Sequence, residues 1–175
     1  ERVRSGCTVL VLSDRCIDAR HAPIPSLLAT AAVHHHLVRE GLRTKVGLVV
    51  ESGEPREVMH LALLIGYGAE AVNPYLALET FHGLERCGML PDGCDAARAQ
   101  RRFISAMDTA LLKTIAKMGI STIQSYCGAQ IFEAVGIAPE VIEEFFCGTP
   151  TRIGGIGLDV IAAEALWRHG RAFPE

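Results

Sequence analysis

Polar side chains that could exchange protons or hold a ligand stand at the ends of four segments with strand-like sequences. The segments are residues 8–12, 46–50, 71–73 and 120–126, and the first two are strongly apolar. The polar residues at these ends are Ser13, Asp14, Arg15, Glu51, Ser52, Asn73, Gln124 and Ser125. In α/β proteins, ligand sites gather at the carboxyl ends of parallel strands. Two interpretations stay open: a ligand pocket or channel mouth, and ordinary turn-making and capping by polar side chains.

A glycine-rich stretch, Gly154-Gly155-Ile156-Gly157, precedes a predicted helix in the manner of a phosphate-binding loop. The dinucleotide-binding pattern would need a further glycine where this chain has Val160, and no Gly-Lys-Ser/Thr sequence follows. Asp159 would put a carboxylate where an anion should bind, and Arg152 is the one residue that favours an anion. The pattern therefore favours a turn, with Asp159 capping its own helix, over a phosphate site.

Two further sets of potential ligands do not predict a metal centre. His34, His35 and His36 are consecutive in a predicted helix, where neighbouring side chains point about 100° apart and cannot converge on one ion. The six cysteines include no Cys-x-x-Cys pair, which favours free, mostly buried thiols in a reducing compartment. A metal-binding module on the histidine run is kept only as a minor alternative.

The composition suits one domain with a substantial core. The chain has 175 residues, of which 49% are hydrophobic, and a formal net charge of -3. This charge gives no reason to expect nucleic acid or an anionic membrane as a partner. No uninterrupted apolar segment approaches the roughly 18 residues of a membrane-spanning helix. The hydrophobic content, together with a first residue that is Glu1 and not Met, favours a segment of a larger protein with apolar interfaces to its neighbours.

Strand-like and helical segments alternate along the chain. The predicted helices are residues 26–40, 55–65, 75–86, 96–118, 128–135, 139–146 and 158–169, and residues 147–157 form a predicted loop. A continuous apolar run such as residues 46–50 is typical of a strand covered on both faces by helices. The alternation predicts an α/β fold: a parallel sheet of about four strands with flanking helices, resembling part of a (β/α) barrel. Residues 1–175 form a single predicted domain, with one possible internal boundary in the loop 89–95.

Several long stretches together resemble one known family. They are LVLSDR (10–15), IPSLLATAAVHHHLVREGLRTKVGLVVESGEPREV (24–58), ALLIGYGAEAVNPYLALET (62–80), KMGISTIQSYCGAQIFEAVGI (117–137) and GTPTRIGGIGLDVIAAEA (148–165). The pattern resembles the large subunit of glutamate synthase, in the later part of its central domain. That domain lies between the amidotransferase domain and the flavin-binding barrel. The likeness covers nearly the whole chain apart from a variable loop near residues 82–100.

The resemblance implies a parent enzyme that makes two glutamates from glutamine, 2-oxoglutarate and a reductant. Ammonia released in the amidotransferase domain would pass through an internal tunnel to the flavin-binding domain. The family's central domain links these two partners and helps to wall the tunnel. The resemblance therefore assigns no catalytic, cofactor-binding or metal-binding residue to this chain. The parent's FMN and iron–sulfur cluster would be bound elsewhere, and the isolated segment is expected to be inactive. The compartment would be the cytoplasm, or the plastid stroma in a plant.

Three cysteines depart from the residues that are usual in the family. Cys127 stands where arginine is usual, Cys16 where glycine is usual, and Cys147 where threonine is usual. Losing an arginine at this point removes a bidentate donor that could hold a carboxylate or another domain. This puts the family's usual contacts between domains in doubt for this chain. The alternative function is a free-standing α/β enzyme that binds a small molecule at the strand ends, with Asp14, Glu51, Asn73 and Gln124 facing one pocket. An incomplete sheet also has open edges, so we expect the isolated segment to self-associate.

Overall fold

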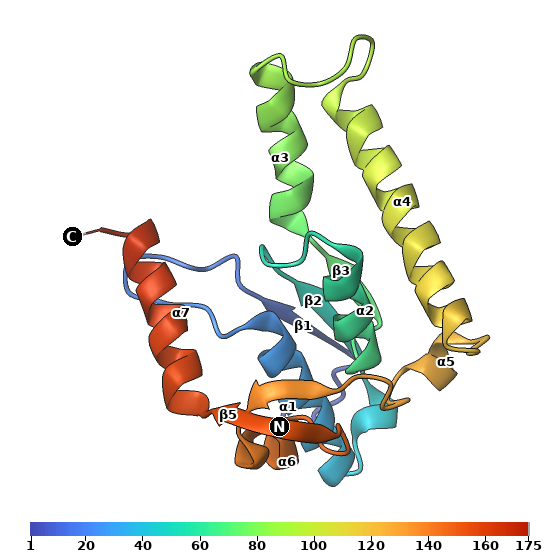
Figure 1. The fold of residues 1–175 in the computed structure, drawn as a ribbon, viewed down its shortest axis with the longest axis vertical. Helices are drawn as coiled ribbons and strands as arrows, with labels where there is room; N and C mark the ends of the chain where they lie inside the picture. Colours follow the sequence, from blue (N-terminus) through green and yellow to red (C-terminus); the bar gives the residue numbers. More distant parts are fainter. Residues whose placement is uncertain (175) are drawn as a thin grey trace.

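The computed structural model describes residues 1–174, and Figure 1 shows strands and helices that alternate along most of the chain. The strands are β1 (Val9–Ser13), β2 (Gly47–Glu51), β3 (Ala71–Asn73), β4 (Ala134–Ile137) and β5 (Thr151–Ile156). The helices are α1 (Ser26–Arg39), α2 (Val58–Gly66), α3 (Tyr75–Arg86), α4 (Ala96–Lys117), α5 (Ile123–Tyr126), α6 (Pro139–Phe145) and α7 (Leu158–Ala172). The predicted α/β class is confirmed.

The first three strands form one parallel sheet in the order β1-β2-β3. Val11 pairs with Val49, and Val49 pairs in turn with Ala71. The strand predictions at 8–12, 46–50 and 71–73 are therefore confirmed to within one residue. Each connection between these strands runs through a helix, as parallel pairing requires.

Helices cover only one face of this sheet within residues 1–174. Leu48 and Val50 point toward α1 and α2 and are at most 1% exposed. The alternate residues Val9 and Val11 lie on the opposite face and remain 53% and 56% exposed. The expectation of a sheet buried on both faces is therefore wrong for these residues. The apolar runs supply a second hydrophobic face that nothing in the described chain covers.

Helices α3 and α4 form a hairpin that projects from the body of the molecule (Figure 1). The two helices meet through the rings of Phe81 and Phe103, whose centroids are 5.6 Å apart. Asp95 caps α4, because its carboxylate accepts a hydrogen bond of 2.6 Å from the backbone N–H of Arg98. The loop 89–95 is thus the tip of this helical arm, and its role as a domain boundary stays a prediction.

Residues 120–126 are not a strand, which corrects the sequence-based prediction. Thr122 caps the short helix α5 by accepting from the N–H of Ser125. Tyr126 is fully buried, and its hydroxyl donates to the carbonyl of Ala62 at 3.0 Å. The isoleucines and threonines of this segment suggested β structure. The cap and the buried tyrosine outweigh that local preference, because Thr122 satisfies a free N–H of α5 and Tyr126 connects α5 to α2.

A second parallel sheet pairs β4 with β5 and also corrects the prediction. Residues 128–135 were expected to be a helix and residues 147–157 a loop. The strands pair closely because residues 136 and 155 are glycines. A Cβ on Gly155 would lie 2.2 Å from the carbonyl oxygen of Gly136. The backbones thus approach more closely than any side chain would permit. The glycine-rich stretch serves strand pairing, with irregular register around Gly136.

The second sheet packs on the first through helices. The side chain of Arg39 in α1 donates to the carbonyl of Glu144 in α6 at 3.3 Å. The hydroxyls of Tyr67 and Thr149 are 2.6 Å apart. Within residues 1–174 the strands stay in these two sheets and no barrel closes.

Candidate functional site

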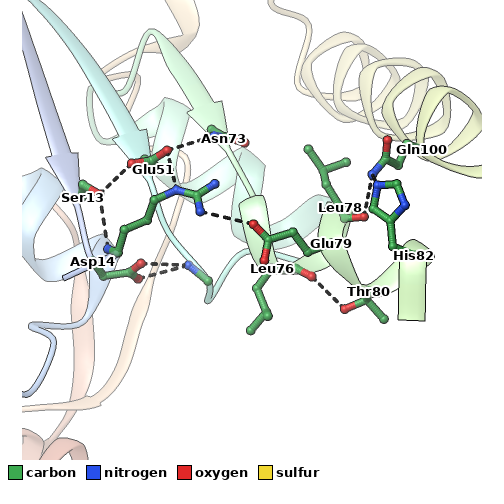
Figure 2. A network of polar contacts seen from close by, with 12 residues as sticks. Ser13, Asp14, Glu51, Asn73, Leu76, Leu78, Glu79, Thr80, His82 and Gln100 are labelled. Carbon is green, nitrogen blue, oxygen red and sulfur yellow. Dashed lines mark hydrogen bonds and ion pairs between the residues drawn. The ribbon is translucent and has the colours of Figure 1, made fainter. Parts of the chain in front are cut away.

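The carboxyl ends of β1, β2 and β3 bring together six of the residues singled out in the sequence. We call them the strand-end rim: Ser13, Asp14, Arg15, Glu51, Ser52 and Asn73. Ser13, Glu51 and Asn73 are aligned across the three strands by the parallel register. Their side chains therefore project on the same face of the sheet, as Figure 2 shows.

The Glu51 carboxylate is the centre of the rim. It accepts hydrogen bonds from the hydroxyl of Ser13 at 2.7 Å, from Nε of Arg15 at 2.8 Å and from the amide of Asn73 at 3.2 Å (Figure 2). The hydroxyl of Ser13, followed by the guanidinium of Arg15, lowers the pKa of Glu51. This carboxylate is therefore held ionised, which suits a structural acceptor and disfavours a role as general acid.

Arg15 extends the rim to helix α3. Its Nη1 lies 3.2 Å from Oε1 of Glu79, and its guanidinium stacks 4.1 Å from the centroid of the Tyr75 ring. Hydrogen bonding to Glu51 raises the pKa of Arg15. Sequence reasoning missed Tyr75 and Glu79, although both lie in the first two turns of the helix that follows Asn73. Their spacing of four residues on one helix face is the signal that could have found them.

Asp14 points to the turn after β2 and not to open solvent. The hydroxyl of Ser52 donates to the Asp14 carboxylate at 2.6 Å, and the N–H of Gly53 donates at 3.1 Å. Ser52 is only 2% exposed. Burial and the nearby Asp14 carboxylate raise the pKa of Tyr75 to about 12, so its hydroxyl stays protonated.

A cavity of about 520 Å³ adjoins the rim on the side of β1 and the loop that follows it. Asp14, Glu51 and Ser52 line it together with Cys16 and Ile24. The rest of the lining is mostly apolar and comes from β1, β2, α1 and the loop, which also contributes Asp18 and His21. The size is within the range of small-molecule sites. The polar groups that face this cavity already bond one another.

Three of the singled-out residues, Gln124, Ser125 and Arg152, lie away from the rim, and Ser125 is exposed in α5 next to Gln124. Gln124 is exposed in α5, and the N–H of Gly128 just beyond α5 bonds the carbonyl of Gly66 at the C-terminal end of α2. That is the opposite end of the sheet, because α2 runs back from the rim (Figure 1). Arg152 lies in β5 and pairs with Glu133 at 3.5 Å. Whether the rim residues serve a ligand stays a prediction.

The histidine run faces several directions along α1, as helical geometry requires. The rings of His34 and His35 meet edge to face at 5.1 Å, and Nδ1 of His34 accepts from Nε of Arg43 at 3.0 Å. Burial, with the Arg43 charge next, lowers the pKa of His34 to about 4. Across residues 1–174, no three His, Cys, Asp or Glu side chains are grouped to hold a metal ion.

The cysteines are more exposed than expected. All six are free; Cys16, Cys87 and Cys147 are exposed, and the other three are intermediate. The expectation of mostly buried thiols is therefore wrong. Burial raises the pKa of the Cys127 thiol, which makes it a poor nucleophile at neutral pH.

The glycine-rich stretch does not have the geometry of a phosphate loop. Gly154 and Gly155 belong to β5, and Gly157 precedes the first turn of α7. No side chain caps α7, so the expected capping by Asp159 is wrong. Its carboxylate lies in the first turn, where it would repel a bound phosphate. These residues do not fit the phosphate group of a flavin or a dinucleotide.

The fold and the rim together define a class: a parallel α/β domain whose strand-end polar groups bond one another and whose sheet has one uncovered apolar face. Comparison with known proteins supplies the family. The profile of the glutamate synthase central domain matches residues 1–138. The chain belongs to the glutamate synthase central domain family, as its sequence pattern indicated.

Individual relatives agree across bacteria, fungi and plants. The chain is 49% identical over 173 residues to the glutamate synthase [NADPH] large chain of Bacillus subtilis, covering 99% of this chain and 11% of that protein. It is 47% identical over 172 residues to glutamate synthase [NADH] of Schizosaccharomyces pombe, covering 98% and 8%. It is 44% identical over 184 residues to the chloroplastic ferredoxin-dependent glutamate synthase of Oryza sativa, covering 99% and 11%.

The chain thus corresponds to only a small part of the relatives that it matches. Through residue 174, the structure has no helix that combines the length and apolar character of a membrane span.

Proposed function

We propose that this chain is a linking segment of a glutamate synthase, which packs between other domains of its parent polypeptide and helps to wall an internal ammonia tunnel. The parent would convert glutamine, 2-oxoglutarate and a reductant into two glutamates. Its partners within the parent would be the amidotransferase and flavin-binding domains. FMN and the iron–sulfur cluster would be bound by those other parts. The compartment would follow the source, with the plastid stroma expected in a plant.

This proposal rests on one observation: the two carboxylates of the strand-end rim accept their hydrogen bonds from neighbouring groups of the protein itself. Glu51 accepts from three side chains, and Asp14 accepts from a hydroxyl and a backbone N–H. A catalytic carboxylate needs an approach for the proton or atom with which it reacts. Here the carboxylates instead fix the ends of three strands relative to one another. A rigid end of a sheet suits a wall between domains.

The uncovered sheet face supports the packing role. Val9 and Val11 are more than half exposed and adjacent on β1, beside Val49 of β2. A contiguous apolar face of this kind is typical of an interface. In the parent polypeptide, it would be buried against a neighbouring domain.

The test compares two variants of the parent enzyme. Val9→Ser/Val11→Ser places hydroxyls on the sheet face, whereas Met89→Ser changes a 70% exposed side chain at the tip of the helical arm and serves as the control. The proposal expects the first variant to release free ammonia from glutamine with reduced glutamate formation, and the control to keep the two coupled. Unchanged coupling in a sheet-face variant with an unchanged melting temperature would contradict the proposal.

The alternative function is small-molecule binding at the rim by a free-standing enzyme. The cavity of about 520 Å³ that reaches Asp14 and Ser52 is the observation that favours it. A screen of small metabolites by thermal shift would discriminate between the two functions. A stabilising ligand whose effect disappears in Asp14→Asn would favour the alternative over the linking role.

A further inference from the structure

Helix α4 carries a row of basic side chains on the face that points away from the protein. We call it the α4 basic stripe: Arg98, Arg101, Arg102 and Lys113, with Ser105, Ala106 and Thr109 between them. All seven residues are exposed. The opposite face of α4 is buried and includes Leu111 and Ile115. The stripe is therefore not needed for the packing of α4 against α3 or α2.

The charges of the stripe have no internal partners. None of the seven ion pairs formed within residues 1–174 involves a side chain of α4. The side chain of Arg98 donates only to the carbonyl of Gly93. Asp95, at the helix start, is occupied by the backbone N–H of Arg98. An ordinary solvated helix face mixes both signs of charge, whereas the stripe is basic only, on a chain whose net charge is -3. Asp108, the one acidic residue of α4, is exposed beside the stripe and is not part of it.

The arrangement is locally unfavourable for the helix that carries it. Arg98 and Arg102 are four residues apart, so like charges face each other on adjacent turns. Arg98 also lies in the first turn of α4, where the helix dipole is positive and favours anions. Carboxylates from outside would relieve both effects. A sequence that departs from local preferences in this way commonly does so for function.

The shape of the stripe indicates what kind of surface fits. A shallow, open concavity runs along Arg98, Arg102, Thr109 and Lys113. At 1.5 Å per residue the row is roughly 22 Å long, which matches about four turns of a second helix. The small side chains Ser105, Ala106 and Thr109 leave room for close approach of that helix. The stripe contains no aromatic side chain on which a nucleic-acid base could stack.

We propose that the α4 basic stripe is a docking surface for an acidic helical segment of the parent polypeptide that lies outside residues 1–175. The surrounding chain is the source of the partner, because the relatives are about nine to twelve times longer than the matched segment. This inference rests on the proposed function in one respect only, namely that the segment works inside a longer polypeptide. It does not depend on the tunnel.

The experiment uses the full-length parent polypeptide and a zero-length carbodiimide cross-linker, which joins a lysine only to a carboxylate in direct contact. We expect Lys113 to be cross-linked to an Asp or Glu outside residues 1–175. We also expect its acylation to be at least about tenfold slower than that of Lys45, as shielding of the amine by the docked helix in about nine molecules of ten would give. Lys45 is the comparison because it is also exposed in this structure.

A pair of charge-reversal variants makes the result specific. Arg101→Glu/Arg102→Glu should abolish the cross-link. Arg20→Glu/Arg56→Glu changes the net charge equally at two exposed arginines outside any ion pair of residues 1–174, and it should keep the cross-link. Because all four arginines are exposed, neither variant should unfold the protein. Equal melting temperatures of the two variants would establish this.

Several outcomes would overturn the inference. The first is an acylation rate of Lys113 equal to that of Lys45, without a cross-link. The second is a cross-link from Lys113 to a carboxylate within residues 1–175 of a second copy of the chain. The third is protection of Lys113 from acylation that nuclease treatment removes. The last would identify nucleic acid as the occupant. Cross-links from other parts of residues 1–175 to the rest of the parent, with none from Lys113, would reject the docking surface alone. No cross-link from any part of residues 1–175 would reject the linking role as well.

Discussion

Ser13 and Glu51 face each other in register on neighbouring parallel strands, and the serine hydroxyl donates to the glutamate carboxylate at 2.7 Å. Both residues end a strand, so this bond lies where an α/β protein would ordinarily bind its ligand. The carboxylate is instead taken up by the protein itself, through Ser13, Arg15 and Asn73. The hydrogen bonds and ion pairs of the strand-end rim therefore hold the three strand ends together and connect them to helix α3.

Replacing Glu51 should loosen the rim. Glu51→Gln keeps the shape of the side chain but removes its charge, so the interaction with the guanidinium of Arg15 is weakened. The new amide NH2 group would also face the donors that now bond the carboxylate, which belong to Ser13, Arg15 and Asn73. We expect the melting temperature to fall by several degrees, as measured by circular dichroism. The matched control is Glu85→Gln, which changes an exposed glutamate of α3 that forms no ion pair within residues 1–174. Equal melting temperatures for both variants would argue against a structural rim.

Two glycines should respond in opposite directions to replacement by alanine. Gly68 has φ of +115°, and a Cβ there would lie 2.2 Å from Nδ1 of His34. Gly83 is within α3 and has open space around it. Gly83→Ala should stabilise the chain by about 0.5–1 kcal/mol, whereas Gly68→Ala should destabilise it by more than that amount. Urea unfolding measures both. A neutral Gly68→Ala would mean that α1 does not pack on this turn as described.

The cap of α4 gives a third prediction. Asp95→Ala removes the carboxylate that bonds the backbone N–H of Arg98, and it should cost about 1 kcal/mol in the free energy of unfolding. Asp92→Ala, in the same loop, is the control because no helix N–H depends on Asp92 in the described residues. Similar losses in the two variants would show that the effect comes from loop charge and not from the cap.

Acid should weaken the fold through His34. The pKa of this histidine falls from 6.5 to about 4 on folding, chiefly because of burial, so the unfolded chain binds a proton more readily. Stability is therefore fully present above pH ~6.5 and is lost as the pH falls toward ~4. Between pH ~7 and ~5 the loss should be on the order of 1 kcal/mol, because solvent around the half-exposed ring screens part of the effect. His35, whose pKa is lowered by burial as well, contributes with the same sign.

The measurement for this prediction is urea unfolding at the two pH values. His34→Gln removes the titrating group, so its unfolding free energy should vary less with pH in this range. A His34→Gln variant with the same pH dependence as the unaltered chain would assign the effect to other groups.

The three-stranded sheet could be predicted because its strands are marked by uninterrupted apolar runs and followed by polar turns. Two errors came from segments without such a signal. Ile120 and Thr122 favour strand by local preference, yet the buried hydroxyl of Tyr126 and the Thr122 cap make residues 123–126 helical. Residues 128–135 suggested a helix and the glycines of residues 147–157 a loop, yet Gly136 and Gly155 permit the close pairing of β4 and β5. The Tyr126–Ala62 bond and the approach of Gly155 to Gly136 join residues distant in sequence, which a local pattern does not contain; only the Thr122 cap is local.

In the strand-end rim, too, some residues could be predicted from the sequence and others could not. Ser13, Glu51 and Asn73 were predictable, because parallel register follows from the strands themselves. For Glu79 the only signal was its spacing of four residues from Tyr75, because its approach to Arg15 depends on how α3 leaves the sheet. Gln124 was misplaced because its segment is a helix at the other end of the sheet.

The most direct test of the linking role is the turnover of the parent glutamate synthase carrying Asp14→Asn, measured per folded molecule alongside its melting temperature. The account predicts that glutamate formation is retained in proportion to the folded fraction, because Asp14 only holds Ser52 and Gly53. A loss of turnover of about a hundredfold or more at an unchanged melting temperature would be the mark of a general acid or base, and it would contradict the account.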